Sequence, residues 1–307
     1  MFEEVLQQGV VILVDGLIYA SYLFMVAIGL TIIFGVMKVL NVTHGSLYAF
    51  GAYLAAMWVG MYYDAELPAY GGFALLFLAP IVVGVGMGLL IERGILQFLY
   101  GRDEHTIVLA TFAAFLILED AIILLWGVDP YFAYQPQAVL DESFGTLNLG
   151  VVDYDLYSIM LIGLAVIVGG ACWFALKATK WGKLLLAVIF DRELGEAMGI
   201  NVTAVYMVTF VLGSILAALG GAFVAPTISV TPGIGVEVIV LAFAVVVIGG
   251  MGSIPGAMIG ALVVGIARAF AVHMFPEVEL FVIYAIMAAV LSFRPEGLFA
   301  PAKARKI

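Results

Sequence analysis

The feature that most constrains this chain is a series of long apolar runs, because a run of about 20 apolar residues crosses a bilayer as a helix. Eight runs are long enough, and a ninth, at 238–250, is short enough to be a tilted span or a re-entrant segment. The eight lie at 10–36, 45–63, 71–99, 105–127, 157–177, 203–225, 256–275 and 279–294. Charged residues make up only 11% of the chain, against about 25% in soluble domains. We therefore predict an all-α polytopic membrane protein, with residues 1–307 forming a single transmembrane domain.

The basic residues predict which loops face the cytoplasm, because lysine and arginine accumulate on that side of membrane proteins. Ten of the twelve fall in three segments: Arg93 and Arg102, then Lys177, Lys180, Lys183 and Arg192, then Arg294, Lys303, Arg305 and Lys306. The loops at 1–9, 63–70, 128–156, 226–237 and 276–279 carry acids and no basic residue, so we place them outside. An outside N-terminus and a cytoplasmic C-terminus need an odd number of crossings. This predicts about nine spans, within a range of eight to ten, with broken or re-entrant segments among them.

The polar stretch at 182–201, between two apolar runs, is predicted to form a short cytoplasmic docking helix. Asp191 can cap its N-terminus, and Gly199 suits the left-handed position after its last turn. The positions between them divide into an apolar face of Leu194, Ala197 and Met198 and a charged set of Arg192, Glu193 and Glu196, in which Arg192 can pair with Glu196. Such a helix fits the groove of a partner protein, and it equally fits an amphipathic helix lying on the membrane.

Three polar or glycine-containing breaks interrupt the apolar runs and are candidates for a translocation pathway, because irregular backbone at membrane depth is tolerated where it lines a cavity. The breaks lie at 41–46, 225–235 and 249–256. Their candidate residues are Asn41, Thr43, His44 and Ser46, then Pro226, Thr227 and Ser229, then Gly249, Gly250 and Ser253. The alternative for the first break is a solvent-exposed cytoplasmic turn beside Lys38.

Glu119 and Asp120 lie well inside the run at 105–127, where an ionised carboxylate needs water or a partner. Neighbouring helical residues point about 100° apart, so these two carboxylates are not expected to converge on one proton. We expect one of them, with Glu119 as the pathway candidate, to face a cavity and the other to serve helix packing.

Outside the runs, the loop at 128–156 is acidic and is predicted to contain a small hairpin that turns near Gly150. It could receive a soluble partner or be a solvated loop of no special role. No metal-ligand spacing, phosphate-binding loop or hydrolase motif occurs in the sequence. We therefore expect no enzymatic activity, no cofactor or metal bound by this chain, and no nucleic-acid partner.

Four segments carry a resemblance to a known family: GLTIIFGVMKVLNVTHGSLYAFGAY, DRELGEAMGIN, VIGGMGSIPGAMIGAL and FRPEGLF. In this order, they resemble the smaller of the two membrane permease types in branched-chain (hydrophobic) amino acid ABC importers. The resemblance implies a type II-like importer permease of the bacterial inner membrane, paired with a second homologous permease subunit. It further implies two cytoplasmic ATPase subunits that use ATP and Mg²⁺, and an extracytoplasmic solute-binding protein. Residues 191–199 would then be the coupling helix.

The sequence departs from the family's pattern at two places. A more basic Gly-Arg-Ala-Met-Arg type of segment is replaced by the residues of 182–186, which puts in doubt the contacts of the missing arginine. An amide pair is common near the position of Glu119 and Asp120, so the acidic pair leaves open a more polar substrate. The residues alone also allow a proton-coupled secondary transporter or a facilitative channel for urea or amides, and they do not name the solute.

Overall fold

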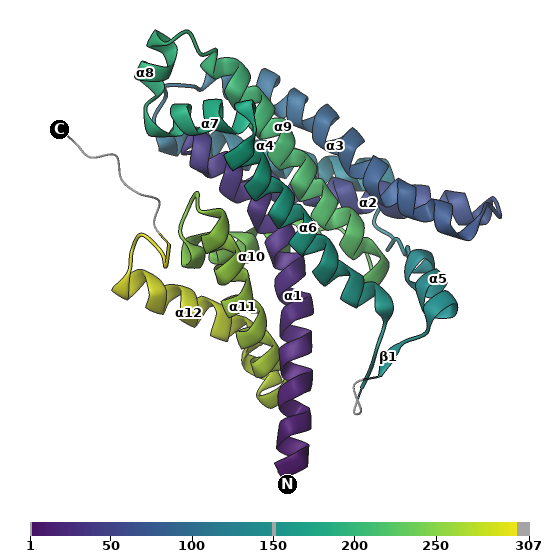
Figure 1. Ribbon diagram of the computed structural model, residues 1–307. Coiled ribbons are helices and arrows are strands. Elements are labelled where there is room, and N and C mark those ends of the chain that lie inside the picture. Colours follow the sequence, from purple (N-terminus) through teal and green to yellow (C-terminus); the bar gives the residue numbers. More distant parts are fainter. Residues whose placement is uncertain (1, 149–151, 300–307) are drawn as a thin grey trace.

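The computed structural model describes residues 2–148 and 152–299, and almost all of this chain is helical (Figure 1). The long helices are α1 (Phe2–Met37), α2 (His44–Asp64), α3 (Gly72–Gly94), α4 (Glu104–Trp126), α6 (Leu156–Ala178), α9 (Val202–Val224), α10 (Ile234–Gly249), α11 (Ile254–Met274) and α12 (Glu279–Phe293). Shorter elements are α5 (Gln135–Phe144), α7 (Lys180–Phe190), α8 (Arg192–Ala197), β1 (Leu147–Asn148), β2 (Asp153–Tyr154) and the 3₁₀ turns η1 (Ala69–Gly71), η2 (Leu96–Phe98), η3 (Ala225–Thr227) and η4 (Pro276–Val278).

Each of the nine predicted apolar runs corresponds to one long helix. Within the described residues, seven helices are long and apolar enough to cross a membrane: α1, α3, α4, α6, α9, α11 and α12. Of the remaining two, α2 is less apolar than the other long helices, and α10 has only 16 residues. The all-α polytopic fold predicted from the runs is confirmed.

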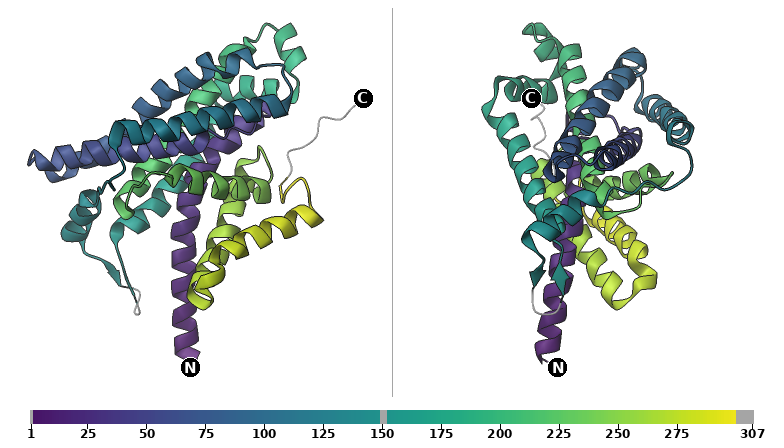
Figure 2. Two further views of the ribbon diagram at one scale, coloured as in Figure 1. Left: turned by 180° about the vertical axis from the view of Figure 1, so that it is seen from behind. Right: turned by 90° about the vertical axis from the view of Figure 1, so that its right-hand side faces the viewer.

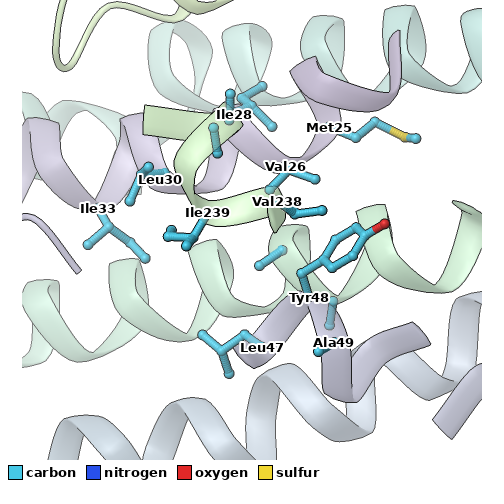
Figure 3. Close-up of a cluster of buried hydrophobic side chains, with 14 of the residues drawn as sticks. Met25, Val26, Ile28, Leu30, Ile33, Leu47, Tyr48, Ala49, Val238 and Ile239 are labelled. Atoms are coloured by element: carbon cyan, nitrogen blue, oxygen red, sulfur yellow. The ribbon is translucent and has the colours of Figure 1, made fainter. Parts of the chain in front are cut away.

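The buried centre of the molecule is formed by the middle of α1 with α2, α9 and α10 (Figures 1 and 2). Side chains of α1, including Val26, Ile28 and Ile33, interleave there with Leu47 and Tyr48 of α2 and with two residues of α10, Val238 and Ile239 (Figure 3). The outer faces of α3, α4, α6 and α12 carry exposed large apolar side chains. Such faces suit lipid or a neighbouring membrane subunit.

Small residues bring the helix backbones of this centre into direct contact, as close packing in membranes requires. A Cβ atom added to Gly51 of α2 would lie 2.3 Å from the carbonyl oxygen of Ala218 in α9. One added to Gly249 would lie 2.2 Å from the carbonyl oxygen of Gly256, where α10 turns into α11. These glycines therefore serve packing.

The link between α1 and α2 returns toward the centre of the molecule before α2 begins. The first residue of α2, His44, places its Nε2 atom 3.0 Å from the carbonyl oxygen of Val26, in the middle of α1. A Cβ on Gly45 would lie 2.4 Å from the carbonyl oxygen of Gly235, in the first turn of α10. The predicted alternative of a solvent-exposed turn at 41–46 is therefore wrong: tertiary packing on α1 and α10 buries every residue of this break except Val42, which is partly exposed.

The acidic loop at 128–156 is more ordered than the sequence indicated, because it contains helix α5. The Asp141 carboxylate at the end of α5 accepts a hydrogen bond from the Leu156 amide at 3.1 Å, which ties α5 to the start of α6. The predicted hairpin is present, with Leu147 paired to Tyr154, whereas its turn at Gly150 lies outside the described residues. A backbone bridge between Tyr131 and Val230 joins this loop to the loop before α10.

Candidate functional site

Two regions at opposite ends of α9 are candidates for function. The first is an elbow of two short helices, α7 and α8, at the extremity of the molecule farthest from the N-terminus (Figure 1). Asp191 follows the last residue of α7, and its carboxylate caps α8 by accepting a hydrogen bond from the Leu194 amide at 2.9 Å. At the other end of α8, Gly199 is left-handed with φ of 81°, and the Ile200 amide donates to the carbonyl of Gly195 at 3.0 Å. These are the two caps that the sequence predicted.

The apolar face of α8 is uncovered. Leu194 is 58% exposed and Met198 69% exposed, and Ala197 lies on the same side. Glu193 and Glu196 are exposed beside them, whereas the side chain of Arg192 lies outside the described residues, so its predicted pairing with Glu196 stays a prediction. The main contacts of α8 are with α7 and α9, and its exposed apolar side chains project away from the bundle.

The side chains of the first break are fully buried and hold the backbone of the α1–α2 link. The Asn41 Oδ1 atom accepts hydrogen bonds from the Thr43 amide at 3.2 Å and from the Thr43 hydroxyl at 2.6 Å. Thr43, His44 and Ser46 are all 0% exposed. The geometry therefore gives these residues a clear packing role, and their pathway role stays a prediction.

Glu119 and Asp120 diverge, as their helical spacing requires. Glu119 is half-buried, and its carboxylate accepts a hydrogen bond from the Ser46 hydroxyl at 3.4 Å and one from the Gly233 backbone. Its position at the N-terminus of α10 places the negative charge at the positive end of that helix dipole. Asp120 is exposed on the outer face of α4.

The second region is a pocket of about 1,000 Å³ at the end of α9 that lies away from α8. Its walls come from α1, α6, α10, α11 and α12 and from the link at 227–231. Thr227 and Ser229 of the second break line it, whereas Pro226 is buried behind them. The third break lies at the other end of α10, where Gly249 packs on Gly256 and the Ser253 hydroxyl accepts a hydrogen bond from the Gly256 amide, and Gly250 lies beside Gly297.

Charged residues within membrane-spanning helices line this pocket, and most of them are paired. Arg268 of α11 pairs with Glu279 at 3.2 Å, and its guanidinium lies 4.0 Å from the centre of the Tyr19 ring. His273 of α11 contacts Asp15 of α1 at 2.7 Å, and Asp15 also accepts a hydrogen bond from the Tyr154 hydroxyl at 2.9 Å. These contacts connect α1, α11, α12 and the hairpin.

Tyr154 stands outside the spanning helices, and its pKa is raised. Burial is the main cause, and the hydrogen bond to the Asp15 carboxylate and the negative charge of that group add to it, which brings the pKa to about 12. The neutral phenol is therefore the form that donates to Asp15.

The sequence did not predict that the main lining residues of the pocket lie together. Glu237 on the first turn of α10 stood in a loop predicted to lie outside, and Tyr19 and Tyr22 belong to an unbroken apolar run. The one available signal was the presence of Asp15 and Arg268 within apolar runs, since ionisable residues at membrane depth mark functional sites. Residues so far apart along the chain could not be paired from local patterns.

Comparison with known proteins gives a consistent set of relatives. A family model described as the branched-chain amino acid transport system / permease component matches residues 12–291. The chain is 29% identical to the high-affinity branched-chain amino acid transport system permease protein BraD of Pseudomonas aeruginosa, over 96% of this chain and 97% of BraD. It is 26% identical to LivH, a permease of the same description in Escherichia coli, over 95% of this chain and 96% of LivH. A probable branched-chain amino acid permease of Methanocaldococcus jannaschii is 27% identical over 94% of this chain and 91% of the relative.

Proposed function

Since this chain belongs to the family of branched-chain amino acid transport system permease components, and is therefore a pore-forming subunit of an ABC importer, we propose that it carries a branched-chain or related hydrophobic amino acid across the bacterial inner membrane. The named substrates of BraD and LivH support this choice of solute. A permease contributes no ATP hydrolysis, so ATP and Mg²⁺ are used by partner ATPase subunits.

The partners follow from the surfaces that the chain leaves open. A second homologous permease completes the pore. Two ATPase subunits lie on the cytoplasmic side, and the α7–α8 elbow docks one of them. A solute-binding protein delivers the amino acid at the opposite end, where the acidic loop 128–156 lies. The N-terminus is then outside and the C-terminus cytoplasmic, as the distribution of basic residues supports.

The observation that carries this proposal is the position of α9 between the two candidate regions. Its first residue, Val202, follows α8 after the cap residue Asn201, and its last, Val224, borders the pocket. A helix of 23 residues spans roughly 33 Å. A displacement of α8 by the ATPases therefore reaches the pocket through one continuous helix.

In the cycle we propose, the two permeases alternate between an outward-open and an inward-open state. The ATPases drive this change by closing on ATP and reopening after hydrolysis. Leu194 and Met198 provide the apolar contact of α8, and Asp191 and Gly199 fix the helix ends. Thr227 and Ser229 lie on the pathway because they line the pocket, and Glu119 supports the N-terminus of α10 behind it.

Uptake of radiolabelled leucine in cells that carry the whole importer tests the proposal. We expect ATP depletion at a maintained proton gradient to abolish uptake, and a protonophore to leave it intact while ATP is kept constant. The opposite result would support the proton-coupled secondary transporter and contradict the ATP-driven importer.

A further inference from the structure

One carboxylate in the pocket is uncommitted. Arg268 is paired with Glu279, Asp15 is paired with His273, and the Asp155 carboxylate caps α6 by accepting from the Ser158 amide at 2.8 Å. Glu237 is exposed into the same pocket and makes no hydrogen bond or ion pair with any residue that the structure describes.

From this arrangement we infer that the pocket is a binding site for a solute that carries a protonated amine, and that Glu237 accepts the amine. This inference rests on the proposed function, since it places the amine of the transported amino acid in this pocket. Glu237 is not among the pathway residues that were predicted from the sequence.

The position of Glu237 suits the binding of a cation. It stands on the first turn of α10, where the positive end of the helix dipole stabilises an anion. A carboxylate without a partner in a pocket wall is a ready acceptor for a cationic group. The solute that passes provides this group each time the site fills.

The surroundings of Glu237 also suit an amine that is attached to an apolar body. Val236 is 46% exposed and Val240 40% exposed, and both line the pocket next to Glu237 on α10. The ring of Tyr22 also lines the pocket, 5.2 Å from the Tyr19 ring that Arg268 already contacts, and aromatic faces attract cations.

The charges of the pocket disfavour an anion. Four acids line its walls: Asp15, Asp155, Glu237 and Glu279. The basic residues of the lining are Arg268 and His273. A carboxylic acid without an amine would meet a negative field in this space, whereas an amine or a zwitterion would gain from it.

The test uses the assembled importer in membrane vesicles. The chain contains one cysteine, Cys172, so a Cys172→Ala background with Val236→Cys places a single thiol beside Glu237. The measured quantity is the rate at which a cationic and an anionic methanethiosulfonate reagent modify this thiol. A single charge near a partly desolvated thiol changes its rate of modification by a charged reagent by roughly tenfold. We therefore expect the cationic reagent to modify the thiol at least about tenfold faster than the anionic reagent does.

The variant Glu237→Gln keeps the size of the side chain and removes its charge, so it should bring the two rates close together. Glu277→Gln is the matched control, because Glu277 is an exposed acid on the same end of the molecule and does not line the pocket. It should leave the rate ratio unchanged. An unchanged ratio in Glu237→Gln, or a thiol that neither reagent reaches, would overturn the proposal.

Protection experiments then address the amine directly. Isopentylamine and leucine should slow modification of Val236→Cys, and 4-methylpentanoate, which has the same apolar body without the amine, should not. Equal protection by the acid would contradict the assignment. A thiol that reacts slowly before any solute is added would also contradict it, because Glu237 would then be covered by the second permease. These readouts need no transport, so failure of ATP-driven uptake would count against the proposed function alone.

Discussion

The Asp191 carboxylate lies 2.9 Å from the Leu194 amide, and this contact fixes the start of a helix whose apolar side chains are uncovered. Leu194 both donates this hydrogen bond and presents a side chain that is 58% exposed. The cap therefore determines where an exposed apolar contact points. In the proposed cycle, coupling between the ATPases and the pocket depends on this contact.

Asp191→Ala should reduce leucine uptake by loosening α8. Loss of such a cap destabilises a helix by about 1 kcal/mol, which is enough to fray one of only six residues. Asp191→Asn keeps an oxygen that can accept from the Leu194 amide, so it should retain most uptake. Uptake rates of the two variants, at matched membrane levels, give the comparison, and equal rates would show that the cap does not matter for coupling.

Glu196→Lys should abolish uptake while the protein still reaches the membrane, because it reverses an exposed charge on the proposed docking face. Glu277→Lys makes the same reversal at the other end of the molecule and away from the pocket lining, so it serves as the control. Uptake is measured with radiolabelled leucine and membrane levels by immunoblot. Normal uptake by Glu196→Lys would refute the docking role.

Gly51→Val should prevent folding, because its first side-chain atom would lie 2.3 Å from the backbone oxygen of Ala218. That oxygen belongs to α9 and cannot move without separating two core helices. Gly60→Val, on the same helix, meets no atom within 4 Å and should fold normally. Size-exclusion chromatography of the tagged proteins in mild detergent distinguishes the two, and a single symmetric peak for Gly51→Val would contradict the packing described.

Arg268 and Glu279 should be coupled in stability, because each leaves the other unpaired in the pocket wall when it is removed. Both side chains are about a third exposed, so we expect a coupling free energy of about 1 kcal/mol in the cycle of Arg268→Ala, Glu279→Ala and the double variant. Thermal unfolding of the purified proteins gives the loss of stability of each single variant and of the double variant, relative to the unmodified protein. Strictly additive losses would show that the pair is not a stabilising contact.

Local features were predictable from the sequence, and long-range ones were not. The caps of α8 depend on Asp191 and Gly199 and on the few residues between them, so the chain itself encodes them. The apolar runs likewise predicted all nine long helices. Burial of His44 depends instead on the middle of α1, which no local pattern encodes.

The pocket escaped prediction for the same reason. Tyr19, Glu237, Arg268 and Glu279 come from four helices and meet only when those helices pack. The polar breaks at 41–46 and 249–256 were chosen as pathway candidates because irregular backbone is visible in a sequence. The structure packs their ends against neighbouring helices, and their pathway role stays a prediction. Charges inside apolar runs were the more informative signal here.

Purification of the importer through a tag on this chain tests the central claim most directly, with the unmodified protein beside Met198→Asp and Met198→Leu. Met198 is 69% exposed, so neither substitution disturbs the bundle, and only aspartate places a charge in the apolar contact. We predict that an ATPase subunit co-purifies with the unmodified protein and with Met198→Leu and is lost from Met198→Asp, while the second permease stays bound to all three. Undiminished recovery of the ATPase with Met198→Asp would contradict docking through α8.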